Sequence, residues 1–175
     1  MALGPVLLTA EEIARRVEEL GAGIRRDYGD RPLTILAVLH GAVVFVSDLI
    51  EHLGGEVALE VVEATSYGDG TASSGQVTLR RYAQLDLAGR DVLIVDDIVD
   101  SGRTLAAVRG AVEAMGARSS RACVLLDKPS RREVPVEIDY LGFEVPDVFV
   151  VGYGLDHAGR HRDLPHIARL DGPED

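Results

Sequence analysis

The residues with the clearest chemical potential lie between Val92 and Leu105, in the order V-L-I-V-D-D-I-V-D-S-G-R-T-L. An apolar run ends in Asp96 and Asp97, and a short turn with a glycine then opens a predicted helix. The unpaired amides and the positive dipole end of a helix N-terminus suit a phosphate monoester. Two acids beside a phosphate are unfavourable unless they bind hydroxyl groups or a metal ion. The pattern therefore predicts a site for a sugar phosphate together with Mg²⁺.

Other interpretations of these acids exist. They could simply cap a helix, which is the better explanation for an isolated acidic pair. Nucleotide hydrolysis and dinucleotide binding lose their main support, because neither G-x-x-x-x-G-K-[ST] nor G-x-G-x-x-G after a strand occurs in the chain. A receiver domain of the response-regulator kind also gathers acids at strand ends. Lys128, the only lysine in the chain, could supply the lysine that such a domain needs late in its fold.

The elements that position these residues follow from hydrophobic periodicity. Thr9 and Glu12 form a capping-box signature before a helical pattern over residues 10–27. Apolar runs typical of buried parallel strands recur at residues 34–39, 57–64, 91–95 and 122–126. Helices are expected between strands at about 42–53 and 105–115. This alternation predicts an α/β fold with a five-stranded, mainly parallel sheet and ligands at the carboxyl ends of its strands.

Two segments break the alternation of strand and helix. Residues 66–75 are dense in Gly, Ser, Thr and Asp, which predicts a surface loop before a further strand at 77–82. The helical period is lost over residues 134–151, where short strands are expected. We predict one domain over residues 1–175, with a core at about 30–130 and a small hood from about 131–175 plus N-terminal residues.

Composition limits the partners. The formal charge of −11 opposes nucleic-acid binding, which depends on Lys and Arg neutralising phosphates. No apolar run reaches the roughly 18 to 20 residues of a membrane-spanning helix, and no secretory leader is recognisable, so we expect a cytoplasmic protein without membrane contact. The single cysteine, Cys123, lies in an apolar run and is expected to be buried.

The stretch from Val92 to Leu105 resembles the phosphoribosyl-pyrophosphate signature of type I phosphoribosyltransferases. The wider pattern is similar to the hypoxanthine-guanine branch of that family, over nearly the whole chain after the first helix. The matching stretches are Leu39 to Gly41, Ser66 to Gly68, Leu126 to Pro129, and Gly142 to Asp156. Each piece is short, but their order and spacing together are specific.

The resemblance implies how phosphoribosyl pyrophosphate is bound. Asp96 and Asp97 would hold the ribose hydroxyls, and Asp100 would act as the general base at purine N7. The 5-phosphate would be bound by the amides and hydroxyls of Ser101, Gly102, Arg103 and Thr104. A main-chain amide in the loop Leu39, His40, Gly41 would bind pyrophosphate. The His40 side chain stays without an assigned role, because many relatives have Lys or Arg there.

The resemblance also implies a purine pocket. Lys128 would donate to the exocyclic O6, which explains a preference for 6-oxopurines because the 6-amino group of adenine would leave the ammonium unpaired. Phe149 would stack on the ring, and the main chain of Val150 and Asp156 would meet the base edge. The Asp156 side chain would take Mg²⁺, and Arg162 would bind pyrophosphate.

Without the family, other interpretations of these residues would be preferred. Phe149 would be a core residue, Arg162 a surface charge, and Lys128 an exposed turn lysine. Ser66 and Tyr67 lie in the predicted loop, where the resemblance makes Tyr67 part of a lid that shields the reaction from water.

The reaction implied is transfer of the phosphoribosyl group from phosphoribosyl pyrophosphate to N9 of hypoxanthine or guanine. The products would be IMP or GMP and pyrophosphate. We expect a homodimer or homotetramer. A rival class is a regulator that keeps this fold to sense nucleotides and bind RNA or DNA, but it would need a basic face, which the charge of −11 disfavours.

Overall fold

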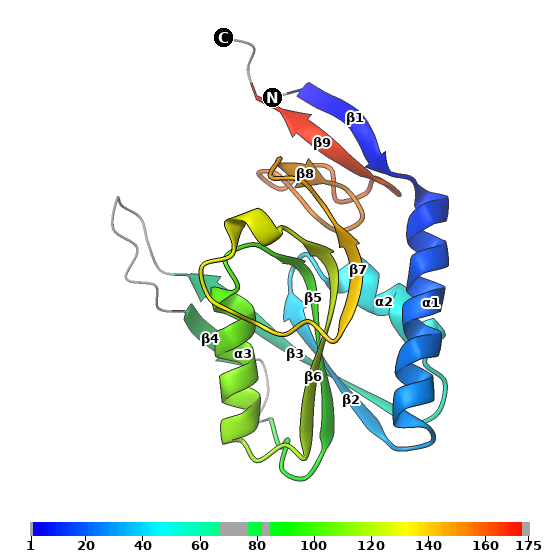
Figure 1. Ribbon diagram of the computed structural model, residues 1–175, viewed down its shortest axis with the longest axis vertical. Coiled ribbons are helices and arrows are strands. Elements are labelled where there is room, and N and C mark those ends of the chain that lie inside the picture. Colours follow the sequence, from blue (N-terminus) through cyan, green and yellow to red (C-terminus); the bar gives the residue numbers. More distant parts are fainter. Residues whose placement is uncertain (1, 67–76, 82–84, 173–175) are drawn as a thin grey trace.

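The computed structural model describes residues 2–66, 77–81 and 85–172. Within them lies a six-stranded sheet with the order β4-β3-β2-β5-β6-β7 (Figure 1). Its strands are β2 (Leu33–Leu39), β3 (Val57–Ser66), β4 (Val77–Arg81), β5 (Asp91–Val99), β6 (Ser119–Asp127) and β7 (Tyr140–Glu144). Strand β4 runs antiparallel to β3, and the other neighbours are parallel. The predicted fold class is confirmed: five parallel strands form the core, and β4 adds an antiparallel edge.

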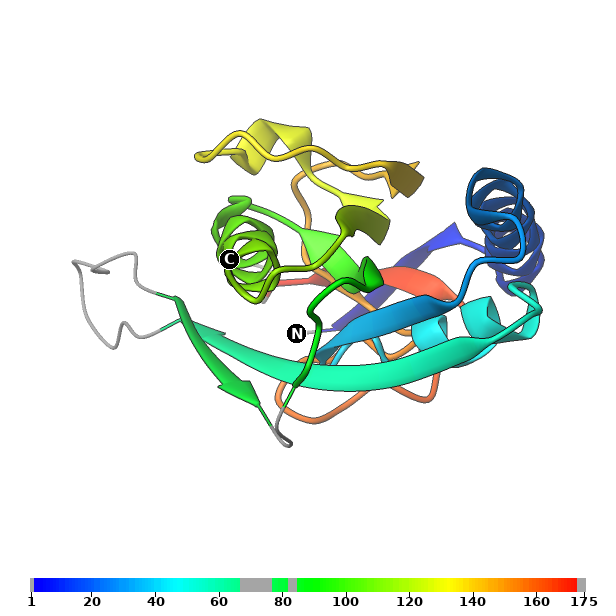
Figure 2. The same cartoon turned by 90° about the horizontal axis from the view of Figure 1, so that it is seen from below.

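The helices cover both faces of this sheet (Figure 2). They are α1 (Ala10–Tyr28), α2 (Val43–Glu51) and α3 (Arg103–Ala114), each within two residues of the predicted bounds. Successive strand residues point to opposite faces. Ile35 and Ala37 of β2 therefore lie in the cluster that includes α1 and α2, while Leu36 and Val38 lie in the cluster that includes α3. Cys123 is buried as predicted.

Helix α1 begins with the predicted capping box. The Glu12 amide donates to Thr9 Oγ1 at 3.2 Å, and the Thr9 amide donates to Glu12 Oε2 at 2.8 Å. The helix ends at Gly29, whose positive φ of 59° suits a residue without a side chain. Its buried face consists of Ile13, Val17, Leu20, Gly21, Ile24 and Tyr28. The helical spacing in the sequence thus identified the face that packs on the sheet.

A second sheet, the small sheet, has the order β1-β9-β8. It joins β1 (Ala2–Leu8), β8 (Val150–Val151) and β9 (Ile167–Asp171), so the two ends of the described chain lie side by side (Figure 1). Strands β1 and β9 were not expected from the sequence. Gly4 and Pro5 weaken the strand pattern of β1, which pairs only along one edge and with an irregular register.

Strand β5 and the segment after residue 131 differ from the expectation. Strand β5 continues through Val99 instead of ending at Val95, because its pairing with β6 extends to Val99 opposite Asp127. Cross-strand pairing here outweighs the low strand propensity of aspartate. The segment after residue 131 contributes β7 to the main sheet, and only β8 and β9 of that segment belong to the small sheet. No helix of the described residues is long and apolar enough to span a membrane.

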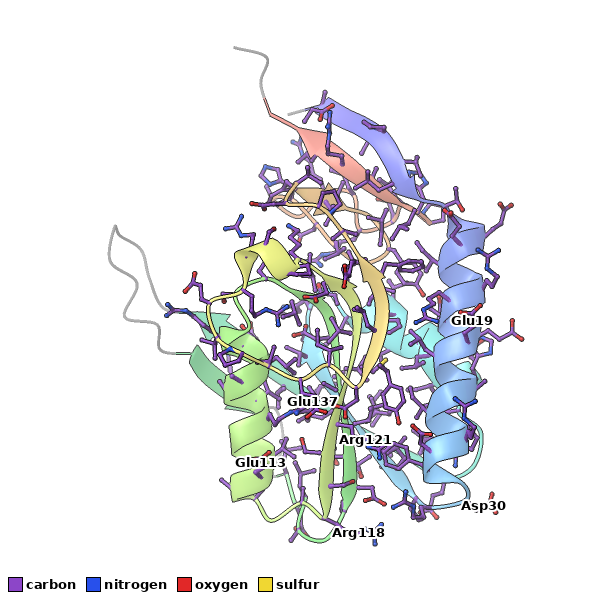
Figure 3. The ribbon with its side chains drawn as sticks, viewed as in Figure 1. Glu19, Asp30, Glu113, Arg118, Arg121 and Glu137 are labelled. Atoms are coloured by element: carbon purple, nitrogen blue, oxygen red, sulfur yellow. The ribbon has the colours of Figure 1, made fainter. Side chains whose placement is uncertain are left out.

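The amino-terminal ends of the strands are fixed by a buried carboxylate, Asp91. Arg31 Nη1 lies 3.3 Å from Asp91 Oδ2, Arg118 Nε donates to Oδ1 at 3.1 Å, and Ser119 Oγ donates to Oδ1 at 2.6 Å. Arg118 lies at the end of the main sheet that is remote from the small sheet (Figure 3). The hydrogen bond from Arg118 lowers the pKa of Asp91, against the opposing effect of burial.

We predict that Asp91→Asn weakens the fold in a pH-dependent way. The pKa of Asp91 is lowered in the folded chain, so its stabilisation is present above its ordinary pKa and is lost as pH falls through the folded pKa. The variant should lose about 2 kcal/mol at pH 7, the usual scale for charge-assisted hydrogen bonds. Urea unfolding from pH 7 into acid measures this difference. A loss of equal size at every pH would contradict an electrostatic origin.

Candidate active site

The segments that carry the predicted site residues, so far as the structure describes them, meet at the carboxyl ends of the parallel strands, the end of the main sheet nearest the small sheet (Figure 1). The loop after β2, the end of β5, the turn before α3, the end of β6 and the connection between β8 and β9 all contribute. Carboxyl ends of parallel strands are where ligands bind in such folds.

Asp96 and Asp97 stand next to each other at the end of β5. The Asp97 amide donates to Asp96 Oδ1 at 3.0 Å, and the Ile98 amide donates to Asp97 Oδ1 at 2.8 Å. Burial raises the pKa of Asp96 well above its ordinary value, and the neighbouring charge of Asp97 raises it further. Burial also raises the pKa of Asp97, while hydrogen bonds and the charge of Arg162 act in the opposite direction. The pair favours partners that satisfy oxygen acceptors, such as hydroxyl groups.

The loop of Leu39, His40 and Gly41 passes directly beside Asp97, and its Leu39–His40 peptide bond is cis. A Cβ atom on Gly41 would lie 1.6 Å from Asp97 Oδ2, so a larger residue cannot fit while that carboxylate stays in place. From the other side, a Cβ on Gly154 would lie 2.5 Å from the Gly41 carbonyl oxygen, and Gly154 has a φ of 96°. Glycine is therefore required at position 154, which was not anticipated from the sequence, and a larger residue at position 41 would displace the Asp97 carboxylate.

The turn before α3 leads directly into the N-terminus of that helix. Gly102, at the N-cap of α3, has a φ of 86° and no side chain with which to cap the first helical turn. Ser101 Oγ accepts from the Arg103 amide at 3.3 Å. A helix start of this kind presents amides and the positive end of the helix dipole to an anion. The Asp100 carboxylate is about half exposed at the mouth of the same turn.

Lys128 is buried, with only 6% of its surface exposed, so its interpretation as an exposed turn lysine is wrong. Its Nζ lies 3.6 Å from Asp100 Oδ1. The Lys128 amide donates to the Val99 carbonyl at 3.0 Å, which ties the residue after β6 to the end of β5. The structure thus brings the predicted purine donor and the predicted base together from two strands.

Asp156 and Arg162 form an ion pair in the connection between β8 and β9. Arg162 Nη2 lies 2.7 Å from Asp156 Oδ1, and Arg162 Nη1 donates to the Gly154 carbonyl at 2.6 Å. The Gly159 amide donates to Asp156 Oδ2 at 2.7 Å. Arg162 is therefore a partly exposed charge held in an ion pair, and its positive charge opposes the rise in the pKa of Asp97.

The donor set is compatible with Mg²⁺. The described residues contain no group of three or more His, Cys, Asp or Glu side chains that could hold a metal by themselves. Mg²⁺ typically uses one or two carboxylates together with substrate phosphates and water. A single carboxylate such as Asp156, close to an arginine that can share a pyrophosphate, fits that pattern.

Phe149 is 48% exposed, which contradicts its interpretation as a core residue. Its ring meets His157 edge to face, with centroids 5.1 Å apart. Val150 is buried in β8, opposite Arg169 of β9. The backbone of Ser66 ends β3 opposite Val77. The predicted lid residue Tyr67 lies outside the described residues.

Sequence reasoning did not single out the segment that packs against the phosphate turn. Arg132, Glu133 and Val134 all contact residues 100–103. They lie outside any regular element, so no periodic signal could have indicated them.

Comparison with known proteins identifies the class of this chain. A family model described as the phosphoribosyl transferase domain matches residues 6–158, so the chain is a member of the phosphoribosyltransferases. A hypoxanthine-guanine phosphoribosyltransferase of Bacillus subtilis is 44% identical, over 94% of this chain and 92% of the relative. One of Mycobacterium tuberculosis is 45% identical, over 95% of this chain and 85% of the relative.

Solved structures of hypoxanthine-guanine phosphoribosyltransferases have the same fold as this chain. The crystal structure of a hypoxanthine-guanine phosphoribosyltransferase from Bacillus anthracis superposes with a TM-score of 0.92 at 37% identity, covering 97% of this chain and all of the other. The chain belongs to the hypoxanthine-guanine phosphoribosyltransferase family. This overturns the receiver-domain alternative. Members of the family catalyse the purine-salvage transfer of ribose phosphate from phosphoribosyl pyrophosphate to hypoxanthine or guanine.

The acid pair leads to a prediction for stability. The pKa of Asp96 is raised in the folded chain, so the contribution of Asp96 to stability is most favourable in acid and is lost as pH rises through that pKa. Asp96→Asn removes the charge and should raise the thermal midpoint near neutral pH, by about 2–4 °C for each ~1 kcal/mol relieved. Calorimetry from pH 5 to 8 measures the difference in thermal midpoint between Asp96→Asn and the wild type. A difference that does not widen with rising pH would rule out this electrostatic account.

Proposed function

We propose that this chain joins hypoxanthine or guanine, through N9, to the ribose 5-phosphate of phosphoribosyl pyrophosphate, giving IMP or GMP and pyrophosphate. Family membership supports the reaction. The observation that carries the proposal is the buried Lys128 ammonium, 3.6 Å from the Asp100 carboxylate at the mouth of a phosphate-binding turn. A lysine donor and a carboxylate acceptor side by side match two neighbouring groups on one edge of a 6-oxopurine, O6 and N7–H.

The phosphoribosyl group would occupy the end of β5. We assign Asp96 and Asp97 to the ribose hydroxyls. Burial raises the pKa of both carboxyl groups and so disfavours their charged forms, and hydrogen bonds from hydroxyl groups would offset that cost. The 5-phosphate would lie on the amides and hydroxyls of Ser101 to Thr104 at the start of α3. The loop of Leu39 to Gly41 and the Arg162 guanidinium would hold the pyrophosphate. Their proximity to Asp97 supports this arrangement.

The chemical step would join purine N9 to the ribose C1, with Asp100 as the proton acceptor. The purine N9 lone pair forms a bond to C1 while the bond from C1 to the pyrophosphate oxygen breaks. Asp100 takes the proton from N7, so the purine is neutral again in the product. Lys128 donates to O6, Phe149 stacks on the ring, and the main chain of Val150 and Asp156 meets the base edge. The exposed face of Phe149 is available for such stacking.

We assign the Asp156 side chain as the protein ligand for Mg²⁺. When bound, Mg²⁺ supplies positive charge that offsets the charge of the pyrophosphate. The residues of the chain would bind and orient the substrate: Asp156 would orient it, and Arg162 would bind its pyrophosphate oxygens. A protein of net charge −11 needs such local cations beside its acids. We also propose the homodimer or homotetramer and the Tyr67 lid expected from the family resemblance.

The proposal is tested by incubating the protein with phosphoribosyl pyrophosphate, Mg²⁺ and each of hypoxanthine, guanine, xanthine and adenine. We expect IMP and GMP to form, adenine to react poorly, and excess chelator to abolish product until Mg²⁺ is added back. Chromatography of the nucleotides gives the answer. Failure to form a nucleotide from any of the four purines would refute the function, and full activity after confirmed removal of metal would refute only the Mg²⁺ assignment.

Lys128→Gln provides a test at the level of one residue. Loss of a hydrogen bond from a charged donor is worth about 1.5–3 kcal/mol, so kcat/KM for hypoxanthine should fall by roughly 10- to 100-fold. The difference in kcat/KM between hypoxanthine and adenine should become smaller, because an amide can also accept a hydrogen bond from an amino group. Arg131→Gln is the matched control, since Arg131 lies nearby but forms an exposed ion pair with Asp147. An unchanged purine preference in Lys128→Gln would dismiss the assignment.

A further inference from the structure

The turn before α3 is held by a distant segment, residues 132–134. The amides of Glu133 and Val134 both donate to the Ser101 carbonyl, each at 3.0 Å. A Cβ on Gly102 would lie 2.5 Å from the Val134 carbonyl oxygen, so the two segments are in close contact. The Arg103 guanidinium donates to Glu133 Oε2 at 2.9 Å and 2.6 Å. The position of the turn therefore depends on residues about thirty positions later in the chain.

Arg132 makes a different kind of contact within this segment. Its Nη2 forms an ion pair with Asp127, and its Nε donates to the Asp100 main-chain carbonyl at 3.3 Å. The Arg132 and Asp127 side chains are only 19% and 11% exposed. Asp127 directly precedes Lys128. One guanidinium thus connects the end of β6, which carries Lys128, with the main chain of Asp100.

The position of Asp100 makes this connection important. The pairing of β5 with β6 ends with Val99 opposite Asp127, so Asp100 is the first residue beyond the ladder. Its carboxylate is nearly half exposed, and the ladder no longer fixes its distance from Lys128. The guanidinium of arginine is a planar fork whose donors keep a fixed geometry, so two groups bound to it are also fixed relative to each other.

We propose that Arg132 is a positioning residue for the reaction. It sets the separation of the Lys128 ammonium and the Asp100 carboxylate, and thereby aligns the O6 and N7 edge of the purine with its proton acceptor. The inference rests on the proposed function. It extends that function to a residue that touches neither substrate.

Arg132→Lys separates two properties of the arginine, its positive charge and the fixed geometry of its donors. Arg132→Lys retains a positive charge for the buried Asp127, which limits the loss of stability. A single ammonium has no fork geometry and cannot hold the Asp127 carboxylate and the Asp100 carbonyl in a fixed relation. The neighbouring Arg131, whose ion pair with Asp147 is exposed on both sides, allows Arg131→Lys as a control of the same chemistry.

The experiment is a double-mutant cycle in single-turnover kinetics with hypoxanthine. Nucleotide formation by the wild type is established first, and its absence would count against the proposed function, not against Arg132. Arg132→Lys should lower the rate about 10²-fold, the scale of a misplaced catalytic group, while Arg131→Lys should not change it. In the Asp100→Asn background, where the proton acceptor is already lost, Arg132→Lys should change the rate by no more than about twofold.

The cycle can also overturn the proposal. If Arg132→Lys slows the reaction by the same factor in both backgrounds, Arg132 acts on the structure in general and not through Asp100. A rate for Arg132→Lys within about twofold of wild type would equally refute it. If thermal unfolding shows that Arg132→Lys does not fold, the uncharged pair Asp127→Asn with Arg132→Gln replaces it in the same cycle, with the same expected and contradicting results.

Discussion

The structure depends on keeping two adjacent carboxylates at the end of a buried strand. Asp96 and Asp97 lose solvation there and repel each other, and both effects raise the pKa of Asp96. Each carboxylate accepts a hydrogen bond from the amide of the following residue, which offsets part of the cost of burying the charge. A side chain at position 41 would displace the Asp97 carboxylate, and the charge of Arg162 acts on Asp97 from the connection between β8 and β9. The surrounding loops are arranged around this pair.

Asp91 and the pair of Asp96 and Asp97 lie toward opposite ends of β5 and differ in their partners. At the amino-terminal end, Asp91 is bonded by Arg31, Arg118 and Ser119, and the Arg118 hydrogen bond lowers its pKa. At the carboxyl end, Asp96 and Asp97 have no such set of cations within hydrogen-bonding distance among the described residues. Near neutral pH Asp91 therefore contributes to stability, whereas the raised pKa of Asp96 marks an electrostatic cost.

The site is assembled from segments far apart in the sequence. Lys128 reaches Asp100 because β5 and β6 are parallel neighbours whose ladder ends at the same level. The turn from Asp100 to Arg103 is supported by residues 132–134, and Gly154 packs against Gly41 across more than half of the chain. Loop residues in this protein are thus positioned by the rigid strand ends to which they connect.

Sequence alone determined what depends on near neighbours. Hydrophobic spacing predicted α1 with its capping box, the alternating parallel strands, and the acid pair followed by a glycine turn at the start of a helix. These features are local, because they depend on periodicity and on residues within one or two helical turns. The tertiary structure decided the rest: β1 forms only against β9, β5 continues to Val99 only because β6 pairs with it, and Lys128 is buried only by its surroundings. Arg131 and Arg132 cannot be told apart in the sequence, yet Arg132 is partly buried against Asp127 and Arg131 is exposed. Burial and long-range hydrogen bonds arise where segments distant in the sequence come into contact, and local sequence patterns do not show which segments these are.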